Sequence, residues 1–154
     1  AQFEFLIGTR DLLSETHNEI TRIRALRGQL ESLEARLDAD DSDAAAELDA
    51  RINEVLETIT SVEEALYQTQ NQSRQDPLNY PIRLNNKLSS LFQTVDTGDA
   101  RPTDQAVAVK TELAAAVRRE LDALEFVWTD SVPELNRLID AAGLTLIDLP
   151  EPSR

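Results

Sequence analysis

Apolar residues recur every three or four positions along most of this chain. The pattern is most regular between residues 43 and 70, where spacings of three and four alternate without a break. The positions are Ala45, Leu48, Ile52, Val55, Ile59, Val62 and Leu66. Such spacing places one apolar stripe on a helix. We therefore predict a helix over residues 43–70, capped by Asp43, that crosses its neighbours at about 20°.

A similar stripe predicts a longer helix over residues 2–38. Its inward positions are Leu6, Leu13, Thr16, Ile20, Ile23, Leu26, Leu30, Leu33 and Leu37. Phe3, Phe5 and Ile7 fall on a different face of this helix. Because helical positions three and four apart share a face, the stripe indicates one buried side, and we expect the three off-stripe residues outside the main core.

Two further helices are predicted in the second half of the chain. The first covers residues 84–97, ends at Gly98, and buries Leu84, Leu88, Leu91 and Val95. The second starts at Thr103, a favourable N-cap. Its stripe is Ala106, Val109, Leu113, Val117, Leu121, Leu124 and Trp128. Ser131, Pro133 and Glu134 fit a capping box, so this helix either restarts there or runs on with a kink before Gly143 ends it.

The connector over residues 71–83 contains Pro77 and Pro81, which disfavour helix before them. It also carries Leu78, Tyr80 and Ile82, which are costly to leave in water. We expect an ordered segment packed along the bundle. Short connections elsewhere favour antiparallel neighbours. The prediction is an all-α, antiparallel up-down-up-down four-helix bundle over residues 1–143, followed by a tail over residues 144–154 whose first residues can pair as an extended piece with part of a longer protein.

The connector is also the chemically richest part of the chain. The candidate binding residues are Arg74, Asp76, Asn79, Tyr80, Arg83 and Asn86. Side chains of these types can satisfy loop backbone and cap the following helix. They can equally form a recognition surface or a contact to another domain. Both interpretations stay open from the sequence.

Charge and composition narrow the range of partners and reactions. The net charge is −14 and the sequence has no cysteine. The charge disfavours nucleic acid and anionic membranes, and no apolar run approaches the roughly 18 residues of a membrane span. Disulfides, thiolate catalysis and cysteine metal sites are excluded. The chain begins at Ala1, so we expect a segment cut or processed from a longer protein.

Known catalytic and metal-binding patterns fit poorly. The single histidine, His17, follows Ser14 at the position where a di-iron bundle needs glutamate, and we expect it at the surface. The acidic turn from Asp38 fails as a calcium loop, since Asp43 replaces the required glycine and Asp49 the required glutamate. No pair of carboxylates stands out as a glycosidase pair. We expect no cofactor, no metal and no catalytic activity from this chain alone.

Residues 71–88, NQSRQDPLNYPIRLNNKL, resemble a segment near the C-terminus of bacterial sortilin-like proteins with Asp-box (BNR) repeats that are described as glycosyl-hydrolase-like. Residues 5–17 and 98–103 are similar too. The resemblance implies a helical bundle that follows an exported β-propeller, with that propeller as its partner. The Ser-x-Asp-x-Gly-x-x-Trp motif of the propeller is absent here, so no catalytic residue carries over.

These observations favour a non-catalytic accessory or interaction module of an exported, extracytoplasmic protein. One alternative is that residues 71–86 complete the active site of a glycosyl-hydrolase-like parent enzyme. Another is a free-standing helical adaptor that dimerises through an exposed apolar stripe. The sequence leaves the ligand and the oligomeric state open.

Overall fold

A computed structural model describes residues 1–40, 42–70, 80–97, 100–144 and 147–148. Within these residues the regular structure is entirely helical, which confirms the all-α class. The elements are α1 (Gln2–Leu37), α2 (Asp43–Leu66), α3 (Leu84–Asp96), α4 (Asp104–Phe126), the π-helical turn η2 (Val127–Ser131) and α5 (Val132–Ala141). None of these helices has an apolar stretch long enough to cross a membrane.

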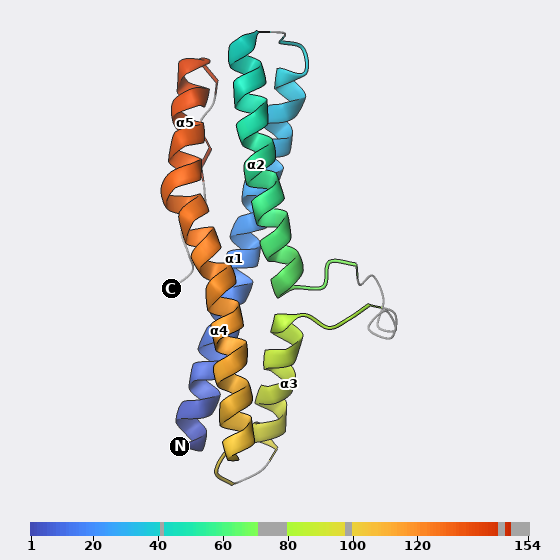
Figure 1. Ribbon diagram of the computed structural model, residues 1–154, viewed down its shortest axis with the longest axis vertical. Helices are drawn as coiled ribbons and strands as arrows, with labels where there is room; N and C mark the ends of the chain where they lie inside the picture. Colours follow the sequence, from blue (N-terminus) through green and yellow to red (C-terminus); the bar gives the residue numbers. More distant parts are fainter. Residues whose placement is uncertain (41, 71–79, 98–99, 145–146, 149–154) are drawn as a thin grey trace.

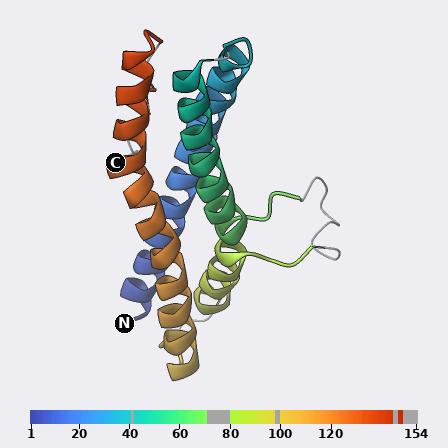
Figure 2. The same ribbon diagram turned by 45° about the horizontal axis from the view of Figure 1, so that its top comes forward.

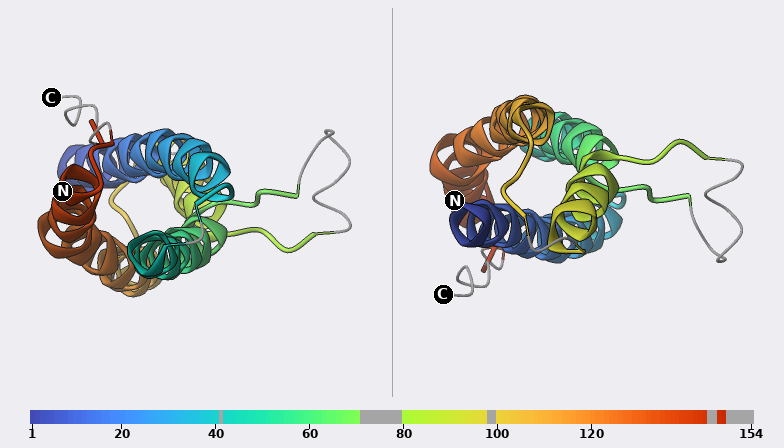
Figure 3. Two further views of the ribbon diagram at one scale, coloured as in Figure 1. Left: turned by 90° about the horizontal axis from the view of Figure 1, so that it is seen from above. Right: turned by 90° about the horizontal axis from the view of Figure 1, so that it is seen from below.

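The helices form three columns of nearly equal length (Figures 1 and 2). α1 is the first column, α2 and α3 lie end to end in the second, and α4, η2 and α5 follow one another in the third. α1 has 36 residues, while α2 has 24 and α3 has 13. At about 1.5 Å per residue, α2 and α3 together match the roughly 54 Å of α1. The views along the long axis show the columns surrounding a common centre (Figure 3).

Contacts with α1 fix the direction of the second column. Near the end of α2, Glu63 pairs with Arg27 in the middle of α1. At the end of α3, the Val95 carbonyl accepts a hydrogen bond from Gln2 at the start of α1. α2 and α3 therefore run the same way, and both are antiparallel to α1.

The third column runs parallel to α1. Lys110, early in α4, contacts Phe5 early in α1, and Arg118 pairs with Glu15 further along. The predicted up-down-up-down order is therefore wrong for the third and fourth helices. α3 continues the direction of α2 and does not reverse it, and α4 runs parallel to α1. The reason is that the connector returns the chain to the level at which α2 ends, so the short α3 covers the half of α1 that α2 leaves bare.

The core confirms the stripe predicted for α2, since every predicted position is buried. The first turns of α1 differ from the prediction. Thr16 is buried as predicted, but Phe5, Thr9 and Leu12 are buried as well, whereas Leu6 and Leu13 are only half-buried. The two threonine hydroxyls donate to carbonyls four residues earlier, each at 2.8 Å. A hydroxyl satisfied by its own helix can be buried without leaving an unpaired polar group. Phe5 lies on the same buried stripe as these threonines, so placing it on a different face was wrong.

The start of the third column is less buried than predicted. Val109 was placed on the inward stripe of α4 but is 44% exposed. Full burial in α4 begins only at Val117 and continues through Leu121 and Leu124. The first turns of α4 therefore present apolar side chains to solvent.

Helix ends follow the capping rules with small shifts. Ser42, and not Asp43, caps α2 through a bond from the Ala45 N–H. Thr103 caps α4 as predicted, accepting from Ala106. Gly143 takes a φ of 69° directly after α5 ends, a conformation that glycine adopts without strain. Tyr67 is already extended, so α2 ends at Leu66, four residues before the predicted end.

The third column passes through Pro133 without restarting. Proline lacks an N–H and clashes with the carbonyl four residues before it. The wider turn η2 absorbs this defect, and the Val132 N–H bonds to the Val127 carbonyl five residues back. Ser131 makes no side-chain cap. The capping-box alternative is therefore wrong, and the continuous helix is correct.

The described part of the tail closes the gap between α5 and α1. Ile147 is buried, and its N–H and carbonyl both pair with the Asn136 amide, at 2.8 and 3.3 Å. The N–H and carbonyl of Asp148 pair in the same way with the Gln29 amide, at 2.9 and 2.6 Å. Each side-chain amide accepts from the N–H and donates to the carbonyl of one tail residue, as the backbone of a neighbouring β-strand would. The backbone groups of these two tail residues are thus satisfied within the chain, and Ile147 belongs to the core of the bundle.

Candidate functional site at the base of the connector

Because α2 ends at Leu66 and α3 begins at Leu84, the connector covers residues 67–83 in the structure. Its two described ends leave the bundle at the same level (Figure 1). Residues 67–70 and 80–83 extend away from the helices side by side (Figures 1 and 3). The buried amide of Gln68 joins them, because its Nε2 donates to the Pro81 carbonyl at 2.7 Å. Its Oε1 accepts from the Gln70 N–H at 3.2 Å. One side chain therefore closes the base of the connector and satisfies both of its own polar atoms.

The last turn of α2 is tied firmly to α1. Glu63 is 3% exposed and pairs with Arg24 at 2.9 Å and with Arg27 at 2.5 Å. Arg27 also donates to the Thr60 hydroxyl. The Arg24 guanidinium lies 5.2 Å from the centre of the Tyr67 ring, at the first residue of the connector. Because both oxygens of the buried carboxylate have a cationic partner, this network fixes the point at which the chain leaves the bundle.

Asparagines organise the start of α3. The buried Asn85 accepts a hydrogen bond from the Asn86 N–H at 2.7 Å. The Asn86 side chain in turn accepts from the Arg83 N–H at 3.5 Å. These bonds occupy backbone donors that have no partner within the helix. Arg83 and Asn86, two of the predicted binding residues, thus take part in the start of the helix.

The remaining predicted binding residues divide into two groups. Tyr80 is described and is 37% exposed on the returning arm, with Ile82 48% exposed two residues later. Arg74, Asp76 and Asn79 lie outside the described residues, as does Leu78. The expectation that the apolar connector residues pack along the bundle is wrong for Tyr80 and Ile82. The second arm instead presents an aromatic ring and an aliphatic side chain to solvent.

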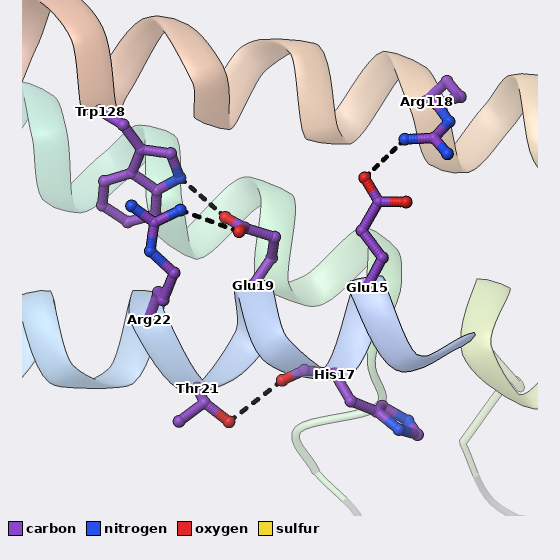
Figure 4. Close-up of polar contacts among 7 residues, drawn as sticks. All are labelled: Glu15, His17, Glu19, Thr21, Arg22, Arg118 and Trp128. Atoms are coloured by element: carbon purple, nitrogen blue, oxygen red, sulfur yellow. Dashed lines mark hydrogen bonds and ion pairs between the residues drawn. The ribbon is translucent and has the colours of Figure 1, made fainter. Parts of the chain in front are cut away.

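A ladder of polar contacts joins α1 to the third column (Figure 4). Glu19 accepts from Trp128 Nε1 at 2.7 Å and pairs with Arg22 at 2.9 Å, while Arg22 lies 4.5 Å from the centre of the Trp128 ring. A second rung pairs Glu15 with Arg118 at 2.6 Å. The sequence indicated Trp128 as a core residue. The sequence did not indicate that Glu19 accepts the hydrogen bond from the Trp128 indole, because the two residues lie 109 positions apart.

His17 is exposed, as expected, and its ring points away from Glu15 and Glu19 (Figure 4). In the part of the chain that the structure describes, no three or more histidine, aspartate or glutamate side chains gather as a metal site would need. The buried Glu63 has both oxygens bound to arginines, so it is not placed to accept a substrate proton. The contacts at the base of the connector hold its two arms in place.

No family model, curated protein or solved structure matches this chain.

Proposed function

We propose that this chain is a non-catalytic interaction module whose contact surface is the connector together with its base. The observation that carries the proposal is the interruption of one helical column at a single point, closed by the bond from Gln68 to Pro81. A column that served only to fill the bundle would need no excursion between α2 and α3. Here the two halves of the column frame an outward-projecting segment.

Exposed side chains at this base support a binding role. Tyr67 and Tyr80 are each 37% exposed and Ile82 is 48% exposed. Tyrosine is enriched in protein interfaces because it offers a large rigid contact area and a polar tip. The network around Glu63 and the cap of α3 hold both arms at their starting points. A surface ordered before binding loses less conformational entropy when its partner arrives.

The partner proposed is a β-propeller that precedes this module in an exported protein. This proposal rests on the resemblance of residues 71–88 to the helical region of sortilin-like, Asp-box proteins. In that arrangement the connector docks against the propeller, and any hydrolytic activity belongs to the propeller. An extracytoplasmic location is part of the same proposal.

The test uses the full reading frame and a direct binding measurement. If a propeller is encoded upstream, it is produced separately, and its affinity for this chain is measured by calorimetry. We expect Tyr80→Ala and Arg74→Ala to weaken binding about tenfold, as interface anchors do. Lys87→Ala, at an exposed site on α3, serves as the control. Unchanged affinity in both connector variants refutes the contact surface, and a reading frame without a propeller refutes the partner.

A second candidate function is self-association as a free-standing adaptor. Val107 and Val109 are 48% and 44% exposed near the start of α4, where an inward stripe was expected. Light scattering distinguishes the two functions. A dimer that Val107→Ser together with Val109→Ser converts to a monomer favours the adaptor, and a monomeric wild-type chain removes it.

A further inference from the structure

A cleft of about 250 Å³ lies between α2 and the third column, away from the connector. It is bordered on one side by α2 and on the other by the end of α4, η2 and the start of α5. Figure 2 shows α5 leaning away from α2 beyond this level. The residues that border the cleft are Arg51, Glu54, Val55, Thr58, Phe126, Val127, Asp130, Ser131, Glu134 and Leu135.

The π turn arranges one wall of this cleft. This wall carries three side chains spaced by four residues, those of Phe126, Asp130 and Glu134. In an α-helix of 3.6 residues per turn, side chains at this spacing point in steadily different directions around the axis. A π turn contains more residues than an α turn, so η2 offsets much of this change in direction and keeps the three side chains on the cleft side. π turns of this kind are frequent at functional sites in proteins.

The floor of the cleft is apolar. Val55, Val127 and Leu135 are buried beneath it, at 6%, 1% and 1% exposure. Phe126 stands at the edge and is 62% exposed, a large aromatic surface left in water. An exposed aromatic ring beside a concave apolar floor can cover one face of a small ligand.

The rim of the cleft is acidic. Three carboxylates, Glu54, Asp130 and Glu134, face one cation, Arg51. Arg51 bonds to Glu54 at 2.9 Å and approaches Glu134 at 4.0 Å across the cleft. Glu54 and Glu134 raise the pKa of Arg51, with the hydrogen bond to Glu54 as the largest cause. The rim therefore keeps an excess of negative charge after its internal ion pair is formed, and Asp130 has no basic partner among the described residues that border the cleft.

We propose that this cleft binds a small organic cation, an amine or quaternary ammonium that carries a short apolar or aromatic group. The apolar group lies on the floor formed by Val55, Val127 and Leu135. The cationic head lies between Asp130 and Glu134, within reach of the Phe126 ring. Carboxylates attract the charge, and the face of an aromatic ring adds a cation–π contribution. The volume is below the roughly 300–1,000 Å³ of drug-sized sites, which limits the ligand to a small molecule.

The experiment compares two probes of the same shape and opposite charge. Phenethylammonium and 3-phenylpropanoate are titrated into the ¹⁵N-labelled chain at low salt, and the amide shifts are followed by NMR. We expect phenethylammonium to shift residues 51–58 and 126–135 saturably, with a dissociation constant of about 1 mM or lower, as suits a small ligand. We expect no saturation with the carboxylate. Equal binding of both probes, or no saturable shift by about 20 mM ammonium, overturns the proposal.

Substitutions in the cleft test which side chains contribute to the affinity for phenethylammonium. Asp130→Asn combined with Glu134→Gln keeps the shape of the rim and removes two of its three negative charges. We expect binding of phenethylammonium to weaken about fivefold or more. Phe126→Ala should weaken binding about threefold or more. Glu112→Gln removes an exposed charge elsewhere on α4 and should leave the affinity unchanged. An unchanged affinity in the double variant, with its spectrum showing an intact fold, also overturns the proposal.

Discussion

The Nε2 of Gln68 donates a hydrogen bond to the carbonyl oxygen of Pro81, 2.7 Å away and 13 residues later in the chain. This bond brings together the two ends of the connector and sets α3 to begin where α2 stops. Gln68 is 4% exposed, although glutamine is normally a surface residue. Its two hydrogen bonds tie Pro81 and Gln70 together at the base of the connector.

We predict that Gln68→Ala loosens the base of the connector. The change leaves the Pro81 carbonyl and the Gln70 N–H without their partner, at a cost of about 1–2 kcal/mol. Amide exchange of residues 67–70 and 80–83 should accelerate, while exchange in the middle of α1 stays unchanged. Gln70→Ala, at an exposed site, is the control. Equal protection of both arms in the Gln68 variant would contradict this role.

Glu63→Gln should destabilise the whole bundle. The amide cannot accept two charge-assisted bonds, so Arg27 loses its partner in a partly buried site. We expect a loss of about 1–3 kcal/mol, below the value for a fully buried pair because Arg24 is 54% exposed. The measurement is urea unfolding followed by circular dichroism. Glu64→Gln, at the exposed neighbouring position, should change the free energy of unfolding by less than about 0.5 kcal/mol.

Two glycines of α1 should respond differently to alanine. A Cβ at Gly28 meets nothing within 4 Å, so Gly28→Ala should add about 0.5–1 kcal/mol of stability through helix propensity. A Cβ at Gly8 would lie 2.9 Å from Lys110 Nζ. That amine donates to the Phe5 carbonyl at 2.8 Å and lies 4.5 Å from the centre of the Phe5 ring. Gly8→Ala should therefore gain less.

A double-mutant cycle checks the cause of this difference. In a Lys110→Ala background the gain from Gly8→Ala should approach that of Gly28→Ala, since no amine remains to be displaced. Thermal unfolding of the four chains gives the coupling. If Gly8→Ala gains as much as Gly28→Ala with Lys110 present, the amine contact does not restrict position 8.

Glu34 should weaken the fold at neutral pH. Burial raises its pKa, and Asp49, Glu31 and Asp38 raise it further. A carboxyl with a raised pKa in the folded state costs stability above that pKa, and the cost disappears once the pH falls below the unfolded value of about 4.3. Glu34→Gln should raise the melting temperature by about 1–2 °C at pH 7. The difference from wild type should vanish near pH 3.5, and Glu57→Gln is the control.

The sequence predicted the helices better than their arrangement. The α2 stripe from Ala45 to Leu66 appears in the core without exception, because its period alone determines which face is buried. The directions in which the helices run were predicted less well. A short connection forces reversal, but the connector is long enough to return the chain to any level. Nothing local shows that α2 and α3 share one column, and only the matching lengths of the columns give a sign of it.

The candidate site shows the same division. Arg83 and Asn86 were found by their polarity, and the helix-capping interpretation of them agrees with their contacts. Gln68 and Glu63 were missed. Their roles depend on partners 13 and 36–39 residues away, which no local pattern records. Phe5 was misplaced because the polar Thr9 interrupts the apolar pattern that joins Phe5 to Leu12 and Thr16.

Because α2 and α3 lie end to end, the connector between them can change in length without changing how the helices pack. Foreign peptide grafted between the two arms would not have to reset the spacing of α1 or of the α4–α5 column, because both run past the junction unbroken. The bundle thus offers a scaffold for displaying inserted loops.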